Sequence, residues 1–562
     1  MLFHHEMEIQ PATANGASRP WFSRFWPWLV VVAAILFVGI IRVRLLAIPL
    51  TRDEGEYAYA GQLILQGVPP YELAYNMKLP GTYFADALGM AVFGQTIAGI
   101  HLTLLLVNSL TIVFVFLLGR KLFGNVAGVV ACISYAVMSL SPVVGGLATD
   151  ANHFVVLFAV PGILLLLKAN ETGGLKTFCW SGLLLGLAFL MKQQGICFGL
   201  FGFVYLIWAA ALNREFFSKR FAGKMLAFGT GLVLPYGLTC LLLAAVGVFE
   251  RFWFWTVVYA RAYEGEMPVS TGIRDYLLDH LQQTRDLSIG FWTLTLAGLL
   301  AAACQRTYRK PMLFTVTFWL FSFLGTAAGF YFRGHYFILV LPAFALLVGM
   351  SVAALQSSWR PAWLADVFKS LPIIAFGLVL SWMIFYQAQT FFQWPAMQVR
   401  RDSSFLRNPF IEAIAVAKLV RENSASDARM AVMGSEPEIY FYAQRRSATG
   451  YIYTYALMES QPHALDMQRD MAREIEMNRP EFLVQVPYYL SWLPKPGSPH
   501  YLADWFEQYA REHYERIGLV GFDLDGKLVS SWGEGSNLPP ASLSEHITIF
   551  RRKTGLPGGV AP

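Results

Sequence analysis

The chain has 562 residues, of which 56% are hydrophobic and only 14% are charged. Soluble globular proteins carry about 25% charged residues, so this composition indicates a polytopic membrane protein. The net charge of +6 is modest and offers no support for nucleic-acid binding. The five cysteines form no CxxC pair, which argues against a zinc site or a disulfide framework.

About eleven apolar runs approach the roughly 20 residues that a membrane-spanning helix needs. They lie near 28–47, 101–119, 126–142, 151–168, 178–191, 195–212, 225–247, 287–304, 311–331, 334–354 and 371–391. The first run has no signal-peptide cleavage site and is expected to remain as an anchor. The sequence therefore predicts an α-helical polytopic membrane domain over 28–394, after an N-terminal tail of residues 1–27.

Lysine placement predicts the orientation of these spans. Most lysines before residue 395 fall in loops on one side, which the positive-inside rule makes cytoplasmic: Lys121, Lys168, Lys176, Lys219, Lys224, Lys310 and Lys369. Lys78 and Lys192 fall on the other side, although arginines in the loop 250–286 run against the bias. The N-terminus is then cytoplasmic, and the loop 51–100 and the C-terminus are external, in a bacterial inner membrane.

The external loop 51–100 is too polar to span a bilayer. Ala58–Leu65 and Tyr83–Phe93 are predicted to form short helices at the membrane interface, and prolines mark turns between them. The loop 250–286 opens with Phe252-Trp-Phe-Trp255. This run is also expected to be an interfacial aromatic helix.

From about residue 395 the composition becomes that of a soluble domain. Asn408-Pro409 predicts a helix start, with Asn408 as N-cap, and the helix continues to Glu422. Strands are predicted over Arg429–Met433 and Glu481–Val486, and helices over Pro437–Gln444 and His463–Asn478. Alternating strands and helices predict a small external α/β domain over 395–562. Its aromatic run, Glu438 to Tyr442 and Tyr451 to Tyr453, either stacks on a sugar or forms the domain core.

Acids at a membrane boundary need a reason to be there, because burying charge in a bilayer is costly. Asp53 and Glu54 directly follow the first span, and Asp150 lies at the external end of the third span or at the start of the fourth. One alternative for Asp53 and Glu54 is a solvated turn, and one for Asp150 is a helix N-cap. If they are functional, either acid serves as a general base.

Several cations are expected on the same membrane face as these acids. They are Lys78, Lys192, Arg44 and Arg333, the last within Arg333-Gly-His335-Tyr336. Each could simply anchor a helix end at the interface. Together they predict an anionic ligand, such as a lipid phosphate, with His335, Tyr336 and Tyr57 as further contacts to the donor.

The order of these motifs resembles bacterial C-type glycosyltransferases, the membrane relatives of protein O-mannosyltransferases and lipid A aminoarabinose transferases. The resemblance begins with Thr51-Arg-Asp-Glu-Gly-Glu-Tyr57, Leu63-Ile-Leu-Gln-Gly67 and Lys78-Leu-Pro80. It continues with Val92-Phe-Gly94, Leu122-Phe-Gly124, Thr149-Asp150, Gly334-His-Tyr-Phe337 and Leu341-Pro342. It covers roughly residues 28–355.

The resemblance implies a polyprenyl-phosphate sugar donor, an envelope acceptor hydroxyl and transfer with inversion on the external face. Carried over by motif, Asp53 is the base, Glu54 its neighbour, Asp150 the second acid, and Lys78 a contact to the donor phosphate. The aminoarabinose transferases carry Glu-Lys-Pro where this chain has Met77-Lys-Leu-Pro80. That departure weakens transfer of their metal site and of their substrate. We expect that no cofactor is required; a divalent metal remains an alternative that the sequence does not indicate.

Two other functions remain open at this point. A transporter or flippase for lipid-linked anions would place charges near the membrane midplane, in broken helices of repeated halves, whereas the charges here fall at one interface. A non-catalytic binder of lipid-linked sugars would not need Asp53, Glu54 and Asp150. The sugar, the acceptor, the prenyl length and the oligomeric state are not determined by the sequence.

Overall fold

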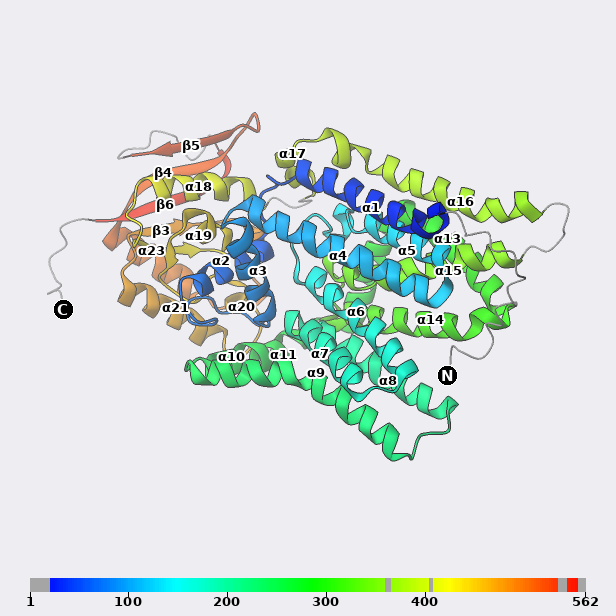
Figure 1. Cartoon of the computed structure of the whole chain (residues 1–562). Helices are drawn as coiled ribbons and strands as arrows, with labels where there is room; N and C mark the ends of the chain where they lie inside the picture. Colours follow the sequence, from blue (N-terminus) through cyan, green and yellow to red (C-terminus); the bar gives the residue numbers. More distant parts are fainter. Residues whose placement is uncertain (1–20, 359–364, 404–407, 534–542, 554–562) are drawn as a thin grey trace. The chain divides into compact units, whose positions relative to one another are not determined.

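The computed structural model describes residues 21–358, 365–403, 408–533 and 543–553 (Figure 1). The predicted N-terminal tail, 1–27, therefore lies largely outside the described residues. By internal packing the chain divides into two units. We call residues Met1–Leu45, His101–Leu241 and Met267–Trp394 the helical unit. We call residues Leu46–Ile100, Leu242–Glu266 and Pro395–Pro562 the mixed unit.

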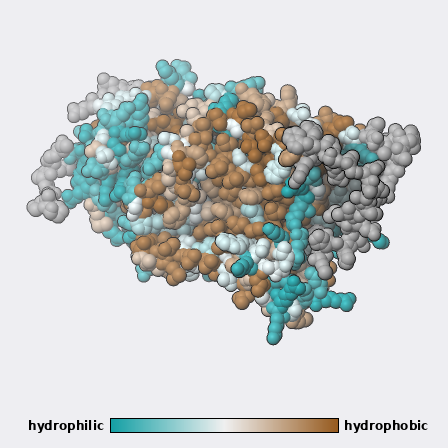
Figure 2. Space-filling view, viewed as in Figure 1, coloured by the Kyte–Doolittle hydropathy of each residue, from teal (hydrophilic) through white to brown (hydrophobic). Residues whose placement is uncertain are grey.

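Each predicted apolar run corresponds to a helix. These helices are α1 (Trp21–Arg44), α4 (Ile97–Phe123), α5 (Asn125–Met138), α6 (Ala151–Thr172), α7 (Leu175–Met191), α8 (Ile196–Leu212), α9 (Lys219–Ala245), α13 (Leu278–Ala303), α14 (Arg306–Thr326), α15 (Leu341–Ser358) and α16 (Ala365–Tyr386). Among the described residues, 8 helices are long and apolar enough to cross a membrane, whereas α5 and α7 are shorter apolar helices. Figure 2 shows apolar side chains gathered over the long helices.

The predicted loop 250–286 is wrong in its second half. The chain is helical from Val269 through α12 (Val269–Thr271) and a π-helix, Gly272–Leu277, into α13. The resulting candidate span, Val269–Ala303, has 35 residues. The error arose because Arg274, Asp275 and Asp279 lower the local hydropathy, although charged residues at the end of a helix do not stop it.

Close helix packing in the helical unit depends on small residues. A Cβ on Gly128 of α5 would lie 2.8 Å from the backbone nitrogen of Arg120 in α4. Small residues let helix backbones approach where lipid supplies no hydrophobic drive for association. α5 also packs against α15, and α6 against α7.

The mixed unit begins with the two short helices predicted in the loop 51–100. They are α2 (Arg52–Leu65) and α3 (Gly81–Phe93), and they pack on each other. Gly61 lies at this contact, because a Cβ there would come 2.9 Å from the backbone nitrogen of Ala87. α2 starts earlier than predicted, and its first turn carries the acidic motif.

The C-terminal part of the mixed unit contains a six-stranded sheet in the order β2-β1-β3-β6-β4-β5. β1, β2 and β3 are parallel, whereas β6 pairs antiparallel with both β3 and β4. The strands are β1 (Arg429–Met433), β2 (Arg446–Ser447), β3 (Phe482–Gln485), β4 (Tyr514–Asp523), β5 (Leu528–Trp532) and β6 (Leu543–Arg552). The helices are α17 (Ala396–Ser403), α18 (Phe410–Glu422), α19 (Glu438–Ala443), α20 (Tyr455–Met458), α21 (Ala464–Asn478), α22 (Tyr489–Trp492) and α23 (Tyr501–His513).

The predicted α/β domain is confirmed in its first half, where α18, β1, α19, α21 and β3 match the expected elements. The predicted N-cap is wrong: Pro409, not Asn408, occupies the N-cap position of α18, with no side-chain cap. The boundary near 395 coincides with the start of the last segment of the mixed unit. In the structure, Leu46–Ile100 and Leu242–Glu266 pack with the predicted C-terminal domain in one unit.

Part of the aromatic segment Leu242–Glu266 packs into the core of the mixed unit, and its predicted place at a lipid interface stays a prediction. It forms α10 (Phe249–Trp253), a π-helix at Phe254–Tyr259 and α11 (Ala260–Glu264). Trp255 stacks on Tyr75 at 5.8 Å between ring centroids, and Tyr451 meets Tyr75 edge-on at 5.1 Å. Tyr451 and Tyr440 are buried, which favours the core interpretation of the C-terminal aromatics.

Candidate active site

The acidic motif after the first span forms the first turn of α2. Thr51 is the N-cap, and it makes a capping box with Glu54. The Thr51 backbone N–H donates to Glu54 Oε2 at 2.8 Å. A Thr-x-x-Glu box satisfies backbone donors that a helix start otherwise leaves unpaired. Glu54 therefore has a structural role and is 1% exposed, while its predicted catalytic role stays a prediction.

Asp53 lies on the same face of α2 as Glu56, because residues three apart are neighbours on a helix. Lys78 bridges the two: its Nζ lies 2.7 Å from Asp53 Oδ1 and 2.7 Å from Glu56 Oε2. The hydroxyl of Tyr83 in α3 donates to the other Glu56 oxygen at 2.7 Å. Glu56 and Tyr83 were not predicted as site residues, although the spacing Asp53-x-x-Glu56 was a usable signal.

Burial and charge act against each other in this cluster. Burial raises the pKa of Glu56, Lys78 lowers it, and Asp53 raises it further, with a net increase. Burial lowers the pKa of Lys78, but the Asp53 and Glu56 carboxylates outweigh it and hold that pKa well above its ordinary value. Lys78 is therefore a fixed cation beside Asp53.

Two aromatic rings enclose the Lys78 ammonium. Its Nζ lies 4.6 Å from the ring centroid of Tyr57 and 5.4 Å from that of Tyr453. Cation–π contacts of this kind stabilise a desolvated ammonium. Tyr57, predicted to bind the donor, thus contacts Lys78, and its contact with a donor stays a prediction.

Two buried ion pairs hold α2 against the C-terminal part of the mixed unit. Arg52 pairs with Glu436 at 2.8 Å and also donates to the Ser435 carbonyl. Arg400 of α17 lies 3.4 Å from Glu54 Oε2. Each pair joins residues more than 340 positions apart in the sequence, so local pattern could not reveal the pairs.

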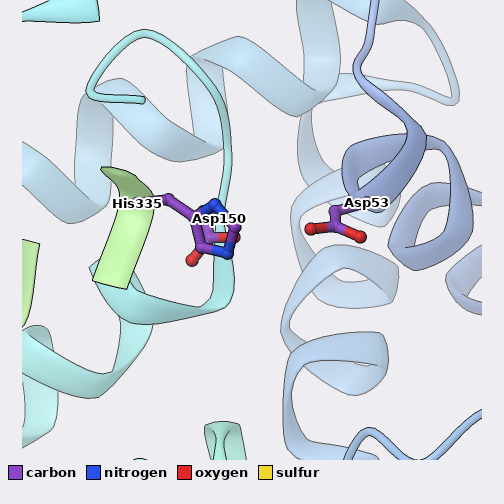
Figure 3. A group of neighbouring side chains, drawn as sticks. All are labelled: Asp53, Asp150 and His335. Atoms are coloured by element: carbon purple, nitrogen blue, oxygen red, sulfur yellow. The ribbon is translucent and has the colours of Figure 1, made fainter. Parts of the chain in front are cut away.

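A second acidic cluster lies in the helical unit, at the start of α6. Asp150 is the N-cap of α6 and accepts from the backbone N–H of Asn152 at 2.9 Å. It also lies 3.8 Å from Lys192 Nζ and 3.8 Å from His335 Nε2. Figure 3 shows Asp150 with His335; Asp53, drawn in the same figure, belongs to the mixed unit. The capping interpretation is thus confirmed, and the predicted cations are its neighbours.

The segment Arg333 to Tyr336 is positioned by a glycine. A Cβ on Gly334 would collide with the Val143 carbonyl, so only glycine permits this approach. His335 lies in the 3-10 helix Gly334–Leu339, and its carbonyl accepts from Asn152 Nδ2 at 2.9 Å. Lys192 Nζ lies 4.5 Å from the Tyr336 ring centroid, and Arg333 lies 5.5 Å from that of Tyr331.

Arg44 has a different environment from the other predicted donor contacts. It donates to the Phe391 carbonyl at 2.8 Å and the Trp394 carbonyl at 2.7 Å, and it also reaches the Thr390 carbonyl. These carbonyls close the π-helix Gln389–Gln393. Arg44 is therefore engaged in holding a helix end, and its predicted donor contact stays a prediction.

Asp150 and His335 are the side-chain types that bind divalent metals. The expectation that the chain requires no metal stays a prediction.

Comparisons with known proteins give the family model, the relatives and the solved structures that this chain resembles. The family model described as dolichyl-phosphate-mannose-protein mannosyltransferase matches residues 78–238. The undecaprenyl phosphate-α-4-amino-4-deoxy-L-arabinose arabinosyl transferase of Pseudomonas aeruginosa strain UCBPP-PA14 is 29% identical over 256 residues, which is 43% of this chain and 44% of that protein. The chain thus matches less than half the length of that relative.

Among solved structures, ArnT from Cupriavidus metallidurans bound to undecaprenyl phosphate superposes with a TM-score of 0.58 at 13% identity, over 93% of this chain and 98% of that one. The chain has the fold of C-type membrane glycosyltransferases. The archaeal oligosaccharyltransferase AglB from Archaeoglobus fulgidus, in complex with an inhibitory peptide and a dolichol-phosphate, shares this C-type fold. Its TM-score is 0.52 at 13% identity, over 92% of this chain and 75% of that one.

Proposed function

We propose that this chain transfers a sugar from a polyprenyl-phosphate donor to a hydroxyl of an envelope acceptor. The C-type fold supports the proposal, as do relatives that are named for transfer from undecaprenyl phosphate. The eight candidate spans agree with a multi-pass membrane protein. We place it in a bacterial inner membrane, with the N-terminus cytoplasmic and the mixed unit external.

The observation that carries the proposal is the Lys78 bridge between Asp53 and Glu56. A general base needs a carboxylate that is ionised at working pH, and a fixed ammonium beside Asp53 favours that form. The same ammonium can neutralise phosphate charge as the glycosidic bond breaks. One cation can thus serve both the base and the leaving group.

The chemical step balances without a cofactor. The acceptor oxygen forms a bond to the anomeric carbon while its proton passes to Asp53. The bond between that carbon and the phosphate oxygen breaks, and polyprenyl phosphate leaves with the electron pair. Phosphate is a good leaving group, so the step needs no general acid of the kind that glycosidases use. Attack opposite the leaving group inverts the anomeric centre.

We also assign Asp150, Lys192 and His335 to this reaction, as a second group of residues. Their support is the approach of two basic side chains to one buried carboxylate. Arg333 and Tyr336 flank that cluster in sequence. The transferred sugar is a pentose or a hexose, and the amino-arabinose named in the relatives is the first donor to test.

The test uses the full chain purified in lipid nanodiscs, with undecaprenyl phosphate-linked amino-arabinose and a panel of envelope acceptors. Mass spectrometry follows the loss of donor and the gain of one sugar on an acceptor. Asp53→Asn should remove nearly all transfer and leave folding intact. The control is Asp525→Asn, because Asp525 is an exposed acid of the same unit.

Three outcomes would contradict the proposal. Near-normal turnover by Asp53→Asn would exclude Asp53 as the base. Movement of intact donor across vesicle membranes, without covalent transfer, would identify a flippase. Donor binding without transfer or movement, for every acceptor tried, would identify a non-catalytic binder.

A further inference from the structure

Tyr453 reaches the proposed base from the C-terminal part of the mixed unit. Its hydroxyl donates to Asp53 Oδ1 at 3.2 Å. The same carboxylate oxygen accepts from Lys78 Nζ at 2.7 Å. Two donors that converge on one oxygen restrict rotation of the carboxylate, and positioning of this kind contributes to catalysis.

The segment that carries Tyr453 is itself held by the loop 51–100 and by the domain core. The backbone N–H of Tyr75 donates to the Gly450 carbonyl at 2.7 Å. The backbone N–H of Thr454 donates to Ser435 Oγ at 2.9 Å. The Tyr453 ring also meets Tyr455 edge-on, with centroids 4.9 Å apart. Tyr453 is thus fixed on both sides along the chain.

We propose that Tyr453 is a positioning residue for Asp53, so that the C-terminal segment completes the catalytic base. This inference rests on the proposed function. Tyr453 lies outside the motifs that resemble those of C-type glycosyltransferases. The positioning role differs from both roles expected from the sequence for the run Tyr451 to Tyr453, which were stacking on a sugar or forming the domain core.

The chemistry of the contact follows from which partner holds the proton. Burial and the Asp53 charge hold the pKa of Tyr453 well above its usual value, so the hydroxyl is a donor at neutral pH. A bond donated to a carboxylate favours its ionised form. Within the mixed unit, the other titratable groups around the pair are Lys78, Glu56, Tyr83, Arg52 and Tyr455.

Tyr453→Phe tests the proposal, because it removes the hydroxyl and keeps the ring. Loss of a hydrogen bond to a charged group should lower the transfer rate about 10-fold to 100-fold. The acid limb of the rate–pH profile should move to higher pH, because the ionised base is less favoured. Tyr489→Phe is the matched control, since Tyr489 is an exposed tyrosine of the same unit.

A second readout does not depend on transfer. Carbodiimide reacts with protonated carboxyls, so peptide mass spectrometry of Asp53 labelling against pH gives a midpoint for proton loss. The midpoint should move to higher pH in Tyr453→Phe. It should move to lower pH when a ring-fluorinated tyrosine, a stronger donor, replaces Tyr453. This second variant keeps the hydroxyl, so it also serves if Tyr453→Phe does not fold.

The two readouts separate the possible failures. Unchanged labelling midpoints in both variants would overturn the role of Tyr453, whatever the activity. Absence of transfer by the wild-type chain would refute the proposed function, while the labelling would still decide the contact. Slower transfer with an unmoved pH profile and midpoint would reduce Tyr453 to a structural residue, and this result would also overturn the proposal.

A separate feature lies in the helical unit, where a cavity of about 440 Å³ opens between α4 and α6. Its lining combines three leucines with three cations: Leu117, Leu164, Leu165, Arg120, Lys121 and Lys168. Lys168 lies about 18 residues along α6 from Asp150, which corresponds to about 27 Å of helix. The cavity is therefore at the opposite end of α6 from the Asp150 cluster.

The cavity lining has three cations, and one of them, Lys121, is paired with an acid. Lys121 pairs with Glu171 at 2.8 Å, and Arg120 lies over the rings of Trp28 and Phe116 at 5.7 and 5.2 Å. Basic pockets between membrane helices bind anionic lipid headgroups, and apolar walls suit the adjoining acyl chain. We infer that this cavity binds the headgroup phosphate of an anionic phospholipid, independently of the proposed function.

Native mass spectrometry of the full chain tests this second inference. The wild type should retain phosphatidylglycerol over phosphatidylcholine, and the double variant Arg120→Gln/Lys168→Gln should lose most of that preference. Lys176→Gln is the control, because Lys176 starts α7 outside the cavity lining. Equal retention of both lipids by the wild type would overturn the inference. So would displacement of the lipid by millimolar inorganic phosphate, which would indicate a simple anion site. If the double variant does not fold, Lys168→Gln alone is measured.

Discussion

Gly55 of α2 lies directly against Glu438 of α19. A Cβ on Gly55 would come 2.6 Å from the backbone nitrogen of Glu438 and 2.7 Å from its Cα. The glycine in the motif Thr51-Arg-Asp-Glu-Gly55 therefore has a packing reason. It permits the helix that carries Asp53 to touch the C-terminal part of the same unit.

Gly55→Ala should destabilise the mixed unit by about 1–3 kcal/mol, because backbone atoms cannot move aside as a flexible side chain can. Thermal unfolding and limited proteolysis of the purified chain measure the loss. Gly377→Ala is the matched control, since nothing lies within 4 Å of a Cβ at that helical position. Equal melting temperatures for the two variants would mean that α2 and α19 can move apart at little cost in stability.

Lys78→Met should destabilise the chain by about 3–5 kcal/mol, because it leaves the buried Glu56 carboxylate without its cation. Adding Glu56→Gln should restore most of the stability, whereas transfer should stay absent in both variants. Lys121→Met is the comparison, because its pair with Glu171 is more exposed and should be worth no more than about 1 kcal/mol. Recovery of transfer in the double variant would show that Lys78 acts only through folding.

Asp86 of α3 should make stability depend on pH. It is 0% exposed, and neither carboxylate oxygen has a hydrogen-bond partner among the described residues. Burial, reinforced by Glu54, holds the pKa of Asp86 well above its usual value. The unfolded chain releases this proton above about pH 4, whereas the folded chain keeps it up to the raised pKa of Asp86. Stability therefore falls as pH rises from about 4 toward that raised pKa.

In thermal melts from pH 5 to 8, Asp86→Asn should remove that part of the slope, which amounts to at most about 1.4 kcal/mol per pH unit. The stability of Asp86→Asn relative to the wild type should therefore increase as pH rises. Asp525→Asn, at an exposed site, should leave the slope as it is. Parallel curves for Asp86→Asn and the wild type would mean that the Asp86 proton plays no part in stability.

The proposed orientation predicts which residues face outward. In a cysteine-free background, single cysteines in the loop 51–100 and after residue 408 should react with an impermeant thiol reagent applied to whole cells. Cysteines at Arg120 and Lys219 should react only after lysis. Labelling of both sets from the same side would overturn the orientation and the span count.

Much of the fold could be predicted because its signals are local. A run of apolar residues favours a membrane helix by itself, and each predicted run corresponds to a helix. The α/β alternation also located β1 and β3, since both strands are short and apolar. Local signals were misread at Asn408 and in the loop 250–286, where a typical cap residue and a few charges do not decide the helix boundaries.

The sequence by itself determined the membrane class, the long helices, and Asp53, Lys78 and Asp150 as candidate residues, because hydropathy and motif order are properties of short segments. Only the tertiary structure decided that Lys78 joins Asp53 to Glu56 and that Tyr453 donates to Asp53 from 400 residues away. It also decided that β6 lies between β3 and β4. Contacts between distant segments form through packing and buried charge, which leave no periodic trace in the sequence.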